Sequence, residues 1–121
     1  MPARWTLPAD HSAAGLARRH VGVELAAWPN VEDIQLVASE LTTNAVEHGR
    51  PPIQVALEIL DGQIRLTVSS TAGATEPTPQ HAAQDEDHGR GLALVGLLAD
   101  AWGWARQEGR LSVWADFARS N

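Results

Sequence analysis

Apolar residues recur at helical spacing in two stretches of the first half of this 121-residue chain. The first stretch predicts a helix from Asp10 or Ser12 to about Trp28, and the second predicts a helix that begins at Asn30 and ends at Gly49, before two prolines. The apolar stripe of the first contains Ala14, Ala17, Val21, Leu25 and Trp28, and that of the second contains Ile34, Val37, Ala38, Leu41 and Ala45.

Four other segments have the alternation of strands. Residues 53–60 and 63–69 alternate about Asp61-Gly62, which is a strong hairpin signal. A short edge strand is expected from Arg4 to Leu7, and a closing hairpin is expected from residues 102–107 and 111–117. An apolar helix is predicted over Gly91–Ala101.

The order of these elements predicts a two-layer α/β (α+β) sandwich. Three helices cover one face of a mixed, mainly antiparallel sheet, and residues 1–121 form one domain. Residues 70–90 have no periodicity and are rich in Ser, Thr, Ala, Pro, Gln, His and acids. A loop of that length within a compact domain is usually functional, so we expect a lid over a binding site.

Composition narrows the classes of function. The chain has no cysteine, which removes disulfides, thiolate metal sites and cysteine nucleophiles. Its net charge is −6, and its nine cationic residues are all scattered arginines, so no direct nucleic-acid contact is expected. No apolar run approaches the roughly 20 residues of a membrane helix. We expect a cytoplasmic protein without a membrane contact.

The second helix carries the strongest candidate chemistry. Glu40, Asn44 and His48 follow one another at a spacing of four, and residues four apart on a helix have Cβ atoms about 6 Å apart. Further along the chain, Gly89-Arg90-Gly91-Leu92 precedes an apolar helix, whose N-terminus favours a phosphate. Together the two motifs predict a nucleotide site under the loop.

These two motifs resemble those of a known family. Residues Glu40–Gly49 are similar to the N box of the GHKL ATPase and kinase superfamily, and residues 89–95 are similar to its later glycine box. The short chain resembles the bacterial anti-sigma-factor serine kinases, especially the actinobacterial ones. The resemblance implies the Bergerat ATP-binding fold, with residues 70–90 as the ATP lid.

The resemblance also implies roles for individual residues. Asn44 would ligate Mg²⁺ and Glu40 would act as the general base toward a serine hydroxyl or water, while Gly89, Arg90, Gly91 and Leu92 would contact the bound ATP. His48 extends the same stripe, although a structural role at the helix C-terminus is the alternative. The implied partners are a sigma factor and a STAS-type anti-sigma factor antagonist, and a homodimer is expected.

One position departs from the family pattern. Ser70 stands where the family carries an aspartate that binds the exocyclic amine of adenine. Loss of a hydrogen bond to a charged group, worth about 1.5 to 3 kcal/mol, predicts ATP binding that is about ten- to a hundred-fold weaker. Ser112, where the family often has a threonine near the base, keeps a hydroxyl.

Two functions therefore stay open. The first is a protein serine/threonine kinase that phosphorylates a serine of an antagonist. The second is a catalytically weak or inactive regulatory module that binds an antagonist or a sigma factor without phosphoryl transfer. A separate cluster in the loop, His81, Asp85, Glu86, Asp87 and His88, is either a solvated lid or a divalent-metal site, but its spacing fits no standard ligand set.

Overall fold

The computed structural model describes residues 3–72 and 90–119, with all side chains in these ranges except those of Arg90 and Gly91. The elements are β1 (Ala3–Leu7), α1 (Ala13–Glu24), α2 (Val31–His48), β2 (Arg50–Leu60), β3 (Gln63–Thr71), α4 (Arg90–Leu98), β4 (Ala101–Gln107) and β5 (Arg110–Ala118). The five strands form one sheet in the order β1-β2-β3-β5-β4. Every pairing among them is antiparallel.

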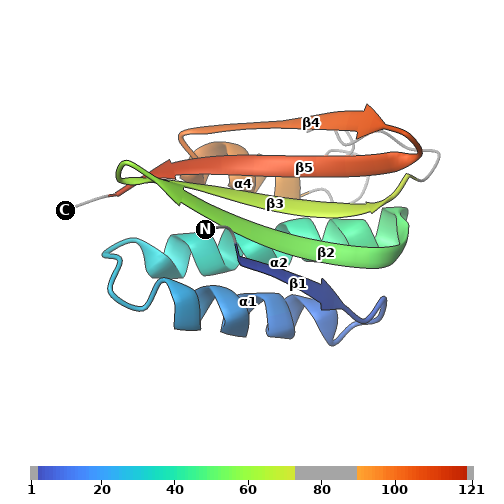
Figure 1. The fold of residues 1–121 in the computed structure, drawn as a ribbon, viewed down its shortest axis with the longest axis horizontal. Helices are drawn as coiled ribbons and strands as arrows, with labels where there is room; N and C mark the ends of the chain where they lie inside the picture. Colours follow the sequence, from blue (N-terminus) through green and yellow to red (C-terminus); the bar gives the residue numbers. More distant parts are fainter. Residues whose placement is uncertain (1–2, 73–89, 120–121) are drawn as a thin grey trace.

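The three described helices cover one face of this sheet, and α2 lies between α1 and α4 (Figure 1). The predicted two-layer sandwich is confirmed, as is the position of β1 at one edge of the sheet. Among the described residues, no helix combines the length and the apolar character that a membrane crossing requires.

Alternation along β3 places the core on the helix side of the sheet. Ile64, Leu66 and Val68 are buried on that side, while Arg65 and Thr67 point to the other. All three described helices contribute buried residues to the same cluster: Ala13, Ala17 and Val21 from α1, Ile34, Val37, Ala38 and Leu41 from α2, and Leu92 and Val95 from α4. Because side chains alternate along a strand, the sheet has a helix-side face in the core and an outer face, and no helix of the described residues covers the outer face (Figure 1).

Both hairpins have two-residue turns in the left-handed region. Asp61 and Gly62 have φ angles of 49° and 78°, and Glu108 and Gly109 have 53° and 77°. This geometry matches the twist of the flanking strands. The first turn is therefore the predicted one, whereas the second is shorter than expected because Arg110 already belongs to β5.

Two helices end earlier than predicted. The first ends at Glu24, not near Trp28: Leu25 leaves the helical conformation with φ −115° and ψ 25°, and the Trp28 N–H then bonds to the Leu25 carbonyl. The last ends at Leu98 because the Asp100 N–H donates to the Asp116 carbonyl at 2.9 Å, which starts the β4–β5 pairing. Sheet pairing thus replaces the last turn predicted for the helix.

Candidate functional site

Helix α2 positions the first group of candidate residues. Its buried stripe packs on the sheet, and acidic residues in its first turn and His48 in its last turn complement the helix dipole. Glu40 and Asn44 are half-buried at the edge of that packed stripe, and His48 is exposed. All three residues lie within α2, so they follow one another at helical spacing, as predicted.

The carboxamide of Asn44 is not used by the fold. Its Nδ2 atom is buried, and no hydrogen-bond partner for it is present among the described residues. A buried polar atom without a partner costs about 1 to 3 kcal/mol, and native proteins rarely keep one without a reason. A ligand that accepts a hydrogen bond from Nδ2, such as a phosphate oxygen, would remove this cost. The Oδ1 atom of the same side chain is of a ligand type that Mg²⁺ accepts.

Ser70 lies at the end of β3 that adjoins the C-terminus of α2. It is on the helix-side face and only 2% exposed. A Cβ atom built on Gly49 would lie 2.8 Å from the Ser70 Cβ, and it would be closer still to the Ser70 Oγ. The sequence predicts Gly49 as a helix stop, and the structure adds a second reason for a glycine there, because the end of β3 and the end of α2 touch.

The second motif lies on the same side of the sheet as the first. Helix α4 begins at Arg90 and packs against α2, and Leu92 is buried with 6% exposure. Gly89 lies outside the described residues, and the side chains of Arg90 and Gly91 are not described. The helices that carry or follow the two motifs, α2 and α4, are therefore neighbours on the helix side of the sheet.

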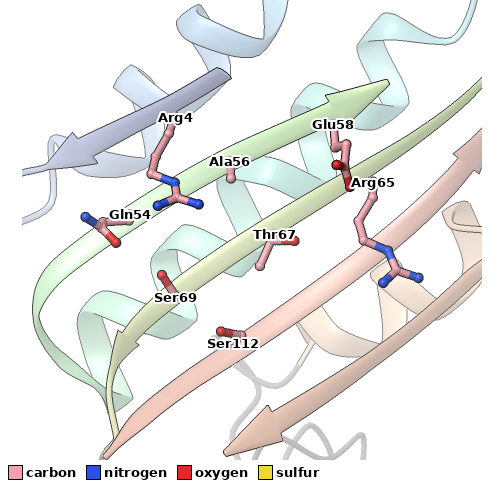
Figure 2. A pocket seen from close by; sticks show the side chains of 8 residues that line it. All are labelled: Arg4, Gln54, Ala56, Glu58, Arg65, Thr67, Ser69 and Ser112. Carbon is pink, nitrogen blue, oxygen red and sulfur yellow. The ribbon is translucent and has the colours of Figure 1, made fainter. Parts of the chain in front are cut away.

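Ser112 is separated from this group, contrary to its expected position near the base. It pairs in register with Ser69, so it lies on the outer face of the sheet, where it lines a shallow hollow (Figure 2). The β5 residue opposite Ser70 is the buried Leu111. The expected position of Ser112 is wrong because neighbouring residues of a strand point to opposite faces of the sheet, and Ser112 is one residue away from the position that faces the helices.

The proposed metal cluster of residues 81–88 lies outside the described residues. Within ranges 3–72 and 90–119, no group of three or more His, Asp or Glu side chains is arranged to hold a metal ion. A magnesium ion at Asn44 would therefore need phosphate oxygens and water for its remaining ligands, as Mg²⁺ commonly does in nucleotide sites.

A family model described as "Histidine kinase-like ATPase domain" matches residues 5–117 of the chain. Among curated proteins, none matches the sequence significantly.

Three solved structures show the same fold. The RsbU and RsbW domains of Rv1364c from Mycobacterium tuberculosis align with a TM-score of 0.77 and 24% identity over 100% of this chain and 33% of that one. The blue-light activated histidine kinase of Erythrobacter litoralis EL346 aligns with a TM-score of 0.59 and 20% identity over 93% of this chain and 61% of that one. The Acinetobacter baumannii histidine kinase AdeS aligns with a TM-score of 0.59 and 13% identity over 98% of this chain and 68% of that one. This chain thus spans about a third of the Mycobacterium chain that it matches.

The contact between Gly49 and Ser70 predicts a penalty for any side chain at position 49. Gly49→Ala is expected to lower the free energy of unfolding by about 1 to 3 kcal/mol, because the new methyl group overlaps Ser70. Gly15→Ala is the matched control: it has no atom within 4 Å of the new Cβ and lies in α1, so it should stabilise by about 0.5 to 1 kcal/mol. Urea unfolding of both variants measures the difference, and equal stabilities would contradict the close contact.

Proposed function

The chain belongs to the histidine kinase-like ATPase domain family, and on that premise we propose that it is an ATP-binding anti-sigma factor and serine/threonine kinase. In this proposal it binds ATP with Mg²⁺, binds a sigma factor, and phosphorylates a serine of a STAS-type anti-sigma factor antagonist. It acts in the cytoplasm as a homodimer.

The observation that carries the proposal is the Nδ2 atom of Asn44, a buried donor that has no partner among the described residues. Asn44 lies one helical turn after the half-buried Glu40, on a helix packed against α4. The amide of Asn44 has the chemistry needed to hold a metal-bound triphosphate. The neighbouring carboxylate of Glu40 has the chemistry needed to accept a proton.

Phosphoryl transfer depends mainly on positioning and on neutralising charge. The Asn44 amide oxygen would ligate Mg²⁺, and the backbone amides of Gly89, Arg90 and Gly91 would face the phosphates. The metal, when bound, offsets the negative charge of the phosphate oxygens. Glu40 would accept the proton of the attacking serine hydroxyl, a role in which a positioned carboxylate contributes about 10²–10⁴-fold in rate.

Ser70 supports a second candidate function, a regulatory module without phosphoryl transfer. It is buried against Gly49 and brings a hydroxyl to the position of the carboxylate that the family uses for adenine. Weaker recognition of the base would lower occupancy by ATP while leaving the protein surfaces able to bind a partner. The two functions differ in whether Mg²⁺-ATP binding leads to turnover.

The partners come from the resemblance, supported by one structural neighbour. In the Mycobacterium tuberculosis protein, an RsbW domain with this fold is part of the same chain as an RsbU domain. We take the presence of these two domains in one chain as support for a regulatory role, while the sigma factor and the antagonist rest on the resemblance alone.

Asn44→Ala is expected to abolish saturable binding of Mg²⁺-ATP in calorimetry. The same change removes a buried amide without a partner, so the variant should be at least as stable as the parent. Gln35→Ala is the control: this amide donates to the Arg18 carbonyl at 3.0 Å, so its loss should lower stability and leave ATP binding intact. Unchanged ATP affinity in Asn44→Ala would remove Asn44 from the site.

Glu40→Gln is expected to bind Mg²⁺-ATP normally and to lose about 10²-fold or more in phosphate transfer to a serine of the antagonist. Transfer of radiolabelled phosphate measures the rate, with Glu32→Gln in the first turn of the same helix as the control. Normal transfer by Glu40→Gln would exclude Glu40 as the base. If the parent protein binds ATP and binds the antagonist but transfers nothing, the regulatory module is the correct function.

Ser70→Asp is expected to tighten Mg²⁺-ATP binding by about tenfold or more, because a carboxylate would accept the hydrogen bond from the adenine amine. Without nucleotide, the variant should be less stable than the parent, since the new charge lies in a buried position beside Gly49. Ser112→Asp on the outer face is the control and should leave affinity unchanged. Equal affinities for Ser70→Asp and the parent would place the base elsewhere.

A further inference from the structure

The outer face of the sheet contains a hollow that the proposed nucleotide site does not use. It has a volume of about 270 Å³, and Figure 2 shows polar side chains from β1, β2, β3 and β5 around it. This volume is just below the roughly 300–1,000 Å³ of typical small-molecule pockets. The hollow is therefore suited only to a ligand smaller than those of typical pockets, such as a small anion.

Strand register explains why the sheet is hollowed here. Ala56 of β2 lies between Arg4 of β1 and Thr67 of β3, and one row further along, Gln54, Ser69 and Ser112 lie side by side. Ala56, Thr67, Ser69 and Ser112 are small residues, so they form a floor below the longer side chains at the rim (Figure 2).

One end of this hollow is rich in hydrogen-bond donors and positive charge. The exposed Arg4 guanidinium makes no hydrogen bond or ion pair with any described residue. Two rows further along the sheet, beyond the residues that line the hollow, Arg110 donates to three neutral oxygens: the Pro52 carbonyl at 2.9 Å, the Thr71 hydroxyl at 3.3 Å and the Ser69 hydroxyl at 3.1 Å. Neither arginine has a carboxylate partner among the described residues.

The acidic groups of this face are concentrated at the other end. Asp116 accepts two hydrogen bonds from Arg65, at 2.7 and 2.8 Å, and these bonds raise the pKa of Arg65. Arg65 also lies 4.3 Å from the centre of the Trp114 ring. Glu58, which also lines the hollow, is opposite Arg65 in the register and one row from the row of Arg4 and Ala56. Arg65 is thus already paired, and the uncompensated charge lies beside the hydroxyl groups.

We propose that this hollow, which we call the outer-face pocket, binds a small oxyanion ligand through a carboxylate or phosphate group. Arg4 would supply a charge-assisted pair of hydrogen bonds, and the hydroxyls of Thr67 and Ser112 would donate to the same group. An arginine fork suits planar carboxylates and phosphates, and the surrounding donors fix the orientation. The pocket is independent of ATP because the sheet separates it from Asn44.

The test is an amide-resolved NMR titration of the whole protein with inorganic phosphate and, separately, with succinate. Saturable shifts are expected at Thr67, Ser69 and Ser112 with at least one of the two anions. Arg4→Gln should weaken that binding by about fivefold or more, since it removes the charged fork. Ser112→Ala keeps every arginine and should also weaken anion binding. A loss of affinity in this variant shows that the hydroxyl takes part, which simple pairing of the anion with a surface arginine would not require.

Two controls separate this pocket from other anion contacts. Arg106→Gln removes an exposed arginine on β4 and should leave the affinity for the anion unchanged. Asn44→Ala should leave the anion-induced shifts on the outer face unchanged even if it abolishes ATP binding. The proposal is wrong if neither anion gives saturable shifts at these amides, if Arg106→Gln weakens binding as much as Arg4→Gln, or if the shifts disappear with Asn44→Ala.

Discussion

Burial of the apolar stripe of α2 against the central strands is the interaction on which the rest of the structure depends. Ile34, Val37 and Leu41 point into the core, where they meet the buried face of β3. This burial sets the rotation of the helix about its axis, because turning it would expose the stripe to water. Glu40 and Asn44 are thereby held half-buried at the edge of the packed surface.

The same packing explains why the helix can retain an unpaired amide. Several fully buried aliphatic side chains, each worth about 1.5 to 3 kcal/mol, stabilise α2 in its position. Against that background the cost of the Asn44 amide, about 1 to 3 kcal/mol, is tolerable. Functional groups are often left less than fully satisfied in this way, since a group already paired within the protein is less available to a ligand.

The sheet divides the molecule into two chemically different halves. Its helix-side face contributes Ser70 to the proposed nucleotide site, and its outer face contributes the neighbouring Ser69 and its partner Ser112 to the outer-face pocket. Adjacent residues of one strand thus serve different surfaces. Because the two sites lie on opposite faces, a single substitution on one face changes one site and leaves the other intact.

The sequence alone determined the elements, their order and the Glu40-Asn44-His48 stripe, because helical and strand periodicities and turn residues act locally. Helix ends were less predictable: Ala101 was expected in a helix, but pairing with Asp116 draws it into β4. Only the tertiary structure decided that Ser112 faces away from Ser70 and that Gly49 must lack a side chain. These facts depend on strand register and on the distance between a helix end and a strand end, which residues far apart in the chain set together.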